Sequence, residues 1–277
     1  AVHNKHPVSR IKMEKQPDGS DKFDLLGADV FYNPEKRTFR MSMEAYVTKV
    51  LERFDMKDCK PRATPSFPEE TLYADSKDST FKIQACVGAL QWLATVCRPD
   101  IAHATNVLAR ASSRKVTNSM ANCARRVLKY LKGTASAGIG YSPEEEEQFK
   151  RTYQEMENHA DNFGQVNSKL IEAPVHTFTD ASFGVAYKTM RSISGVVIYL
   201  HGVPVAWRSK VQTVFASSTT ESEWIALSEG VEMETSVIGL QEFLVGKSQD
   251  AGPLWCDNRG AVVCARKGPD GTDEIPK

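Results

Sequence analysis

The sequence predicts a mixed α/β protein whose first part is of the α+β type. Three observations lead to this prediction. Residues 23–39 hold two apolar runs around a turn signal, residues 83–133 repeat apolar side chains at helical spacing, and residues 175–211 are rich in β-forming residues. A helix, a short strand and a second helix then follow, which is the order expected of a sheet covered by helices.

The composition is that of a globular chain with an uneven charge distribution. Hydrophobic residues make up 41% and charged residues 25% of the 277 residues, and the net charge is zero. Residues 1–140 carry 23 Lys and Arg against 15 Asp and Glu, whereas residues 141–277 carry 12 against 20. We expect a basic part that holds polyanions and an acidic part that holds cations, although two solvated surfaces of different charge would give the same counts.

Neither a membrane span nor a disulfide framework is predicted. No apolar run reaches the roughly 18 residues that a membrane span needs, and the first residues lack the apolar core of a signal peptide. The six cysteines form no CxxC pair and no Cys/His cluster at zinc-ligand spacing. A reducing, intracellular setting is therefore expected.

The first 80 residues predict a hairpin, a helix and a connector. The segment "FDLLGADVFYNPEKRTF" (23–39) reads as a β-hairpin turning at "NPEKR". Ser42 then opens a helix whose apolar residues share one face, and Pro61 and Pro65 end it. Residues 60–80 are a polar connector with several prolines.

Residues 83–133 predict at least three helices, the last ending at Gly133. In that helix Arg125, Lys129 and Lys132 share the face opposite the apolar one. This basic face is either a phosphate contact or an ordinary solvated surface. Residues 141–175 contain a run of four glutamates and little apolar content, which predicts an acidic linker or an exposed insertion.

The remaining chain predicts three strands, a helix, a strand and a helix. The strands are "VHTFTDAS" (175–182) and the two runs of "SGVVIYLHGVPVAWRSK" (194–210), which are joined by a turn at "HG". "PLWCDN" (253–258) supplies the fourth strand. We expect it to run parallel to the first, because a helix lies between the third and the fourth.

The helix that begins in "SSTTESEWIALSEG" (217–230) carries two glutamates with different tasks. Ser218 and Glu221 form a capping box, in which the glutamate reaches back to the backbone N–H of the serine. Glu223 instead starts the inward apolar stripe and therefore needs a partner or a cation. The predicted stripe continues through Ala226, Leu227, Gly230, Met233, Val237, Leu240 and Leu244.

Two aspartates are expected to join Glu223. Asp180 alternates with Phe178 and should point the same way as that core ring, and Asp257 alternates with Trp255 at the end of its strand. Three converging carboxylates predict a site for a hard divalent cation, chiefly Mg²⁺. As an alternative, Asp257 and Asn258 could cap the helix that follows. Cys256 is expected to be a small core residue rather than a nucleophile.

These motifs resemble one family. "FTDAS", "SSTTESEWIALSEG" and "LWCDNRGAV" resemble the RNase H domain of Ty1/copia-type retrotransposon Pol polyproteins, and "RPDIA" and "LKYLKGT" resemble the reverse transcriptase thumb and connection segment before it. The resemblance implies an RNase H-like mixed sheet with covering helices. It divides the chain into the end of the reverse transcriptase palm (1–66), a helical thumb-like subdomain (67–140), the acidic segment (141–175) and an RNase H-like domain incomplete at its C-terminus (176–277).

The resemblance also implies a function and a site. The metal-binding acids of the family fall on Asp180, Glu223 and Asp257, which would hold two Mg²⁺ or Mn²⁺ ions and hydrolyse RNA in RNA–DNA hybrids. Asn258 falls on a position that touches the sugar of the substrate strand. The implied partners are an RNA–DNA hybrid or a primer–template duplex and the rest of the Pol polyprotein, without a membrane. The implied location is cytoplasmic, in a virus-like particle, or nuclear.

Two departures from the family leave enzymatic activity open. A fourth carboxylate, expected about twenty residues after Asp257, has only Asp270 and Asp273 of a Gly- and Pro-rich tail as counterparts. No adjacent Asp-Asp pair is present, so the polymerase motif is absent. The alternative is an inactive nucleic-acid-binding remnant or a connection-type module. An integrase or transposase is disfavoured, because those enzymes usually place the glutamate last of the three acids.

Overall fold

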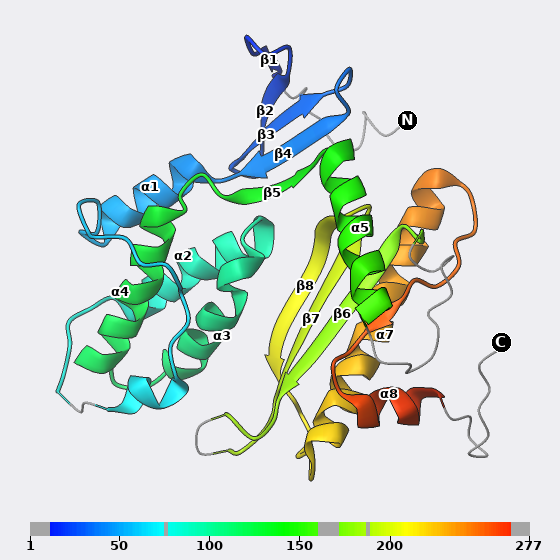
Figure 1. The fold of residues 1–277 in the computed structure, drawn as a ribbon. Coiled ribbons are helices and arrows are strands. Elements are labelled where there is room, and N and C mark those ends of the chain that lie inside the picture. The colour runs from blue at the N-terminus through cyan, green and yellow to red at the C-terminus, as the bar shows by residue number, and fades with distance from the viewer. Residues whose placement is uncertain (1–11, 75–76, 160–171, 187–188, 267–277) are drawn as a thin grey trace, which may run out of the picture.

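The chain folds into two sheets with helices around them. The computed structural model describes residues 12–74, 77–159, 172–186 and 189–266 (Figure 1). The first sheet is antiparallel throughout and has its strands in chain order. Its strands are β1 (Glu14–Lys15), β2 (Asp21–Leu25), β3 (Ala28–Asn33), β4 (Thr38–Ser42) and β5 (Gly138–Tyr141).

The predicted hairpin of residues 23–39 contains one more turn than expected. β3 and β4 pair around "NPEKR" as predicted, but Leu26 and Gly27 form a second tight turn, with φ of 56° and 83°, that separates β2 from β3. A two-residue turn with both φ angles positive matches the twist of a hairpin, and the leucine concealed it in an apolar run.

The helices of the first half enclose the larger hydrophobic core, which includes Leu90, Leu108 and Leu128. The first helix begins at Glu44 and not at Ser42, because Ser42 is the last, buried residue of β4. The helical elements are α1 (Glu44–Arg53), η1 (Glu69–Tyr73), α2 (Ile83–Val96), η2 (Pro99–Ile101), α3 (Ala102–Ala111) and α4 (Asn118–Gly133).

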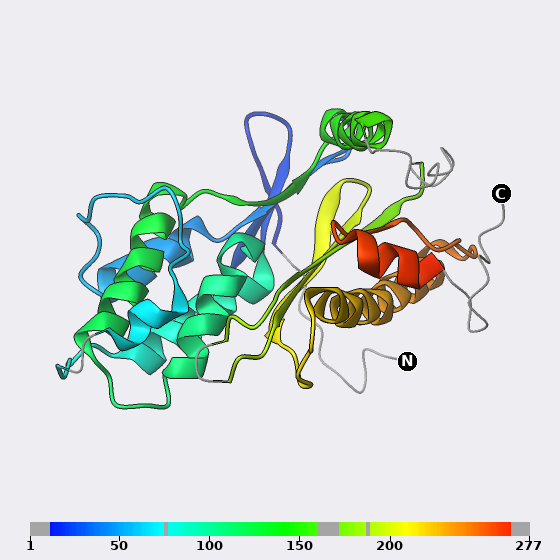
Figure 2. The ribbon, with the colours of Figure 1, turned by 60° about the horizontal axis from the view of Figure 1, so that its bottom comes forward.

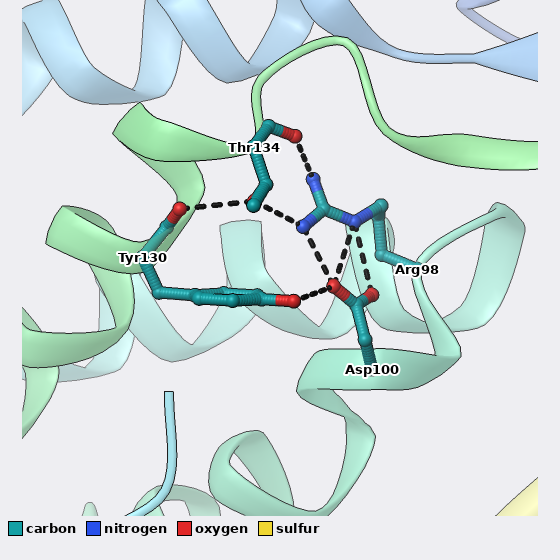
Figure 3. Close-up of polar contacts among 4 residues, drawn as sticks. All are labelled: Arg98, Asp100, Tyr130 and Thr134. Carbon is teal, nitrogen blue, oxygen red and sulfur yellow. Dashed lines mark hydrogen bonds and ion pairs between the residues drawn. The ribbon is translucent and has the colours of Figure 1, made fainter. Parts of the chain in front are cut away.

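The "RPDIA" and "LKYLKGT" motifs meet in one polar cluster, which Figure 3 shows. The side chain of Arg98 is 1% exposed, and its Nη2 lies 2.7 Å from Oδ2 of Asp100. The same guanidinium donates to the carbonyl and hydroxyl oxygens of Thr134, over 2.9 and 2.7 Å. The hydroxyl of Tyr130 donates to Asp100. These contacts join the end of α2 to the end of α4.

The second sheet has the order β8-β7-β6-β9. The short strand β9 runs parallel to β6, as predicted, and the other pairs are antiparallel. His201 and Gly202, with φ of 52° and 78°, make the predicted turn between β7 and β8. The elements are β6 (Val175–Ser182), β7 (Ile193–Leu200), β8 (Val203–Val211), α7 (Thr219–Val245), β9 (Leu254–Trp255) and α8 (Arg259–Arg266).

The acidic segment expected as a linker or exposed insertion contains a helix, α5 (Pro143–His159). Figure 2 shows the second sheet between α5 on one side and α7 on the other. Phe149 and Tyr153 supply the apolar side of α5. They contact an aromatic group on the sheet that consists of His176, Phe178, Tyr199 and Trp255. Two aromatic rings one helical turn apart thus pack α5, a helix of low apolar content, against the second sheet.

The other face of the sheet packs against α7, but only along part of that helix. Ala226, Leu227 and Gly230 are buried as predicted. Leu240 and Leu244, predicted to belong to the same stripe, are 60% and 72% exposed. Gln241 is still buried, so the inward face at this level is made by Val237, Ile238 and Gln241, with Leu240 on its flank, and Leu244 lies beyond the last buried residue of α7.

The helical part contacts the second sheet at its edge strand β8. The indole N–H of Trp207 donates to the carbonyl oxygen of Ala94 over 2.6 Å, and His103 Nδ1 lies 3.3 Å from the hydroxyl of Ser209. A cavity of about 310 Å³ remains at this junction. Within the described residues, no helix is both long enough and apolar enough to span a membrane.

Candidate metal site

The start of α7 separates the roles of its two glutamates. The hydroxyl of Ser218 accepts the backbone N–H of Glu221 over 3.1 Å, so Ser218 is the predicted N-cap. The carboxylate of Glu221 accepts the N–H and hydroxyl of Ser217, at 2.7 and 2.6 Å, rather than the N–H of Ser218 as predicted. Glu221 thus remains exposed on the capping side, and Glu223 turns toward the sheet.

Glu223 is a buried carboxylate with 5% of its surface exposed. Its Oε1 accepts the backbone N–H of Ala181 in β6 over 3.1 Å, and the thiol of Cys256 lies 3.8 Å from Oε2. Burial raises the pKa of Glu223, and the negative charges of Asp180 and Asp257 raise it further, whereas the Ala181 N–H lowers it. A cation bound to this carboxylate would therefore stabilise its charged form, in addition to the hydrogen bond from Ala181.

Asp257 and Cys256 complete a group of close ligand atoms. One ligand atom from each of Glu223, Cys256 and Asp257 lies within 4.8 Å of the other two. Both residues directly follow β9, which the sheet order places beside β6. The end of a parallel strand and the first turn of the covering helix thus meet, as the sequence predicted for Glu223 and Asp257.

Asp180 lies in β6 and is exposed, and it is not a member of that close group of the described residues. Asp180 shares a face of β6 with Phe178, as alternation predicted, but that face lies under α5 and not under α7. Phe178 packs against Tyr153 of α5, whereas Thr179, one residue on, faces Gly230 of α7. Phe178 and Asp180 therefore share the face under α5. Asp180 is still near enough that its charge raises the pKa of Glu223.

The donor atoms of this group fit a hard cation through oxygen. Glu223 and Asp257 offer carboxylate oxygens, the ligands that Mg²⁺ and Mn²⁺ prefer. Burial raises the pKa of Cys256, and the neighbouring carboxylates raise it further, so its sulfur remains a neutral thiol that faces Glu223. A buried carboxylate whose nearest charged neighbours are acids is the feature of this site that a bound cation would stabilise.

Asn258 caps α8. Its side-chain Oδ1 accepts the backbone N–H of Ala261 over 3.0 Å, and its carbonyl oxygen accepts the N–H of Val262. The capping alternative for the "DN" pair therefore holds for Asn258. Asp257 stays in the acidic group. The cap uses one lone pair of the Asn258 Oδ1, so the amide nitrogen and a second lone pair are left for a sugar contact.

The basic residues of α4 do not form one free surface. The guanidinium of Arg125 lies 5.0 Å from the ring centre of Phe81 and donates to Asn122. Lys129 is half-buried, while Lys132 is exposed. The expected phosphate contact of Arg125, Lys129 and Lys132 remains a prediction.

Sequence reasoning missed Gln212, which links the strands to the start of α7. Its side chain is fully buried, and Nε2 donates to the hydroxyl of Ser194 over 3.0 Å and to the carbonyl oxygen of Ser222 over 2.8 Å. Ser222 precedes Glu223. The sequence offers no clear signal for Gln212, a polar residue that directly follows β8, although buried amides are normally hydrogen-bonded.

Comparison with known proteins identifies relatives among transposon proteins. The chain is 28% identical over 250 residues to the retrovirus-related Pol polyprotein from transposon TNT 1-94 of Nicotiana tabacum, covering 86% of the chain and 16% of the polyprotein. It is 29% identical over 230 residues to that from transposon RE2 of Arabidopsis thaliana, covering 81% and 14%. The putative transposon Ty5-1 protein YCL074W of Saccharomyces cerevisiae is 27% identical over 232 residues, covering 82% and 65%.

The chain thus corresponds to less than a fifth of the two polyproteins, 16% and 14% of their lengths. No family model matches the chain, and no solved structure does.

Proposed function

The chain belongs to the Pol polyproteins of Ty1/copia-type retrotransposons, and from this we propose that its second sheet is an RNase H-like nuclease domain. The reaction is hydrolysis of the RNA strand of RNA–DNA hybrids with a divalent cation, and the helical part before it is the thumb-like segment of a reverse transcriptase. The order β8-β7-β6-β9 with a parallel β9, covered by α7, supports this assignment.

One observation carries the proposal. Glu223, at the start of the covering helix, is buried and meets Asp257, at the end of the parallel strand, within 4.8 Å. A glutamate that only caps the helix start can remain exposed, as Glu221 does. An inward carboxylate beside a second carboxylate has its most direct explanation in a cation that binds both.

The residues divide the work as follows. Glu223 and Asp257 would hold the cation, which supplies activation of a water molecule and stabilisation of the leaving oxygen. Asp180, in β6, lies outside this close group and acts on Glu223 through its charge. The Ala181 N–H fixes the orientation of the Glu223 carboxylate, and the Cys256 thiol faces its second oxygen. Gln212 fixes the backbone of the first turn of α7.

A cleavage assay tests the proposal. The purified chain is incubated with an RNA–DNA hybrid labelled on the RNA strand, with Mg²⁺ or Mn²⁺, beside Glu223→Gln and Asp257→Asn. Loss of several kcal/mol of transition-state stabilisation predicts rates more than about a hundredfold lower for both variants. Asp250→Asn, at an exposed aspartate outside the acidic group, should cleave as the wild type does. Equal cleavage by wild type and Asp257→Asn would refute the assignment.

A second function is favoured by the position of Asp180 outside the close group. If the three acids never share a cation, the chain is a nucleic-acid-binding module that holds a primer–template duplex without cutting it. This candidate predicts duplex binding that weakens steeply with salt. It also predicts the same absence of metal-dependent cleavage in the wild type and in both variants.

A further inference from the structure

Apolar side chains are exposed at the end of the second sheet that holds the acids. Phe183, Val214 and Phe215 are 41%, 53% and 62% exposed. Phe183 directly follows β6, which carries Asp180, and the other two lie between β8 and the start of α7, which carries Glu223. Neighbouring exposed apolar residues often mark a binding surface.

A buried serine ties the two segments together. The hydroxyl of Ser192 accepts the backbone N–H of Gly184 over 3.2 Å, and its carbonyl oxygen accepts the N–H of Gln212 over 2.9 Å. Phe183 adjoins Gly184, and Val214 lies two residues after Gln212. The segments that carry Phe183, Val214 and Phe215 are therefore held to each other, and we call these three exposed residues the apolar platform.

The platform is also anchored to the acidic group. The buried side chain of Gln212 donates to the carbonyl oxygen of Ser222, the residue before Glu223. At the other end of the same segment, Ser217 is held by the carboxylate of Glu221. Val214 and Phe215 thus sit in a short bridge that is fixed at both ends.

The charges beside the platform favour a polyanion. Lys210 and Arg191 are exposed, and within the described part of the chain neither forms an ion pair. The adjacent acid, Glu221, stays negatively charged because the hydrogen bonds from Ser217 lower its pKa, but Lys210 and Arg191 together outnumber it. Exposed aromatic rings next to unpaired cations are the combination that binds nucleic-acid strands, because the rings contact bases and sugars while the cations meet phosphates.

We propose that the apolar platform contacts the nucleic-acid strand that lies in the metal site, with Phe215 as its principal contact and Lys210 as its phosphate partner. This inference rests on the proposed function, and it names the surface that positions the hybrid beside Glu223 and Asp257. A basic and aromatic surface so close to the acids offsets their repulsion of the phosphate backbone.

Fluorescence anisotropy tests the platform separately from cleavage. Affinity for a labelled RNA–DNA hybrid is measured on the full chain without divalent cations, so that no cutting occurs. Phe215→Ala should bind about tenfold more weakly, and Phe215→Tyr, which keeps the ring, should bind as the wild type does. Phe243→Ala is the matched control, because Phe243 is 83% exposed at the far end of α7. It should leave the affinity unchanged.

The outcomes separate the platform from the nuclease. Equal affinities of Phe215→Ala and Phe243→Ala, or no binding by the wild type, would overturn the platform even if the chain cleaves hybrids. Binding that depends on Phe215 without metal-dependent cleavage would support the platform and remove the nuclease assignment. If light scattering shows a dimer that Phe215→Ala converts to a monomer, with the affinity unchanged, the surface serves a second copy of the chain and the proposal is wrong.

Discussion

Trp207 and Ala94 are joined by a 2.6 Å hydrogen bond that runs from the second sheet to the helical part. Ala94 lies two residues before the end of α2, so its carbonyl oxygen is one of the last four that have no partner within the helix. The indole of an edge strand thus completes a helix end. This hydrogen bond satisfies a carbonyl oxygen at the end of α2 and also joins the helical part of the chain to the second sheet.

Replacing Trp207 should therefore weaken this contact in two steps. Trp207→Phe keeps most of the ring but removes the N–H, which should lower the free energy of unfolding by about 1 kcal/mol. Trp207→Ala also removes the packing and should lower it further, by about 3 kcal/mol in total. Urea unfolding followed by circular dichroism measures both values. Trp92→Phe, in an exposed position of the same helix α2, should change the stability by less than about 0.5 kcal/mol.

The polar cluster of Arg98 predicts that a single isosteric substitution, Asp100→Asn, destabilises the protein about as much as Trp207→Ala does. Asp100→Asn leaves the buried guanidinium without its counter-charge, which should lower the free energy of unfolding by about 3 kcal/mol. Lys57→Ala breaks the exposed pair with Glu52, which solvent screens, and should leave the urea midpoint nearly unchanged. Similar urea midpoints for the two variants would show that the cluster is not a stabilising contact.

The same cluster should make stability fall in acid. Burial raises the pKa of Asp100, but the hydrogen bonds and charge of Arg98 and the hydroxyl of Tyr130 outweigh it and hold the pKa below its usual value. The stabilisation is present above the unfolded pKa of about 4 and is lost as pH falls through the lower folded-state pKa. Asp100→Asn should lack this part of the acid dependence in unfolding measured between pH 5 and 2.

The sequence predicted the orientation of a site residue correctly where the periodicity of a single helix determines that orientation. Glu223 follows from helical periodicity alone, and its burial and closeness to Asp257 agree with that prediction. The direction of Asp180 required knowing which helix covers Phe178. That helix is α5, whose glutamate-rich sequence conceals the two rings that seat it. Alternation gives two faces of a strand but does not say which partner covers each.

Lengths and turns were the other source of error. The α7 stripe was continued through the apolar Leu240 and Leu244, whereas the residue buried at that level of the helix is the polar Gln241. The turn at Leu26 and Gly27 was overlooked because a leucine rarely adopts a positive φ. The buried face of α7 depends on tertiary contacts, whereas the turn at Leu26 and Gly27 is local and exposed.

Two glycines of α7 test how closely that helix lies on the sheet. A Cβ at Gly230 would come within 2.6 Å of Cγ2 of Thr179, so Gly230→Ala must push the helix away from β6 and should cost about 1–3 kcal/mol. A Cβ at Gly239 meets nothing within 4 Å, so Gly239→Ala should stabilise by about 0.5–1 kcal/mol. Thermal unfolding of both variants measures the contrast. Stabilisation by Gly230→Ala would mean that α7 does not contact the sheet as described.

Glu234, one turn beyond Gly230, should make the protein less stable as pH rises. It is buried and accepts the backbone N–H of Gly252 over 2.9 Å. Burial raises its pKa above the ordinary value, although the Gly252 N–H lowers it. Because the folded-state pKa lies above the unfolded one, the neutral carboxyl favours folding at low pH. That contribution is lost as pH rises through the folded-state pKa.

Glu234→Gln removes this dependence while keeping an oxygen for the Gly252 N–H. The free energy of unfolding of the variant should therefore exceed that of the wild type at pH 7 and approach it near pH 4. Urea titrations at both pH values measure the difference. Glu232→Gln, an exposed position in the same turn of α7, is the control and should show no such divergence. Parallel pH profiles of wild type and Glu234→Gln would mean that Glu234 is ionised at no cost in the folded chain.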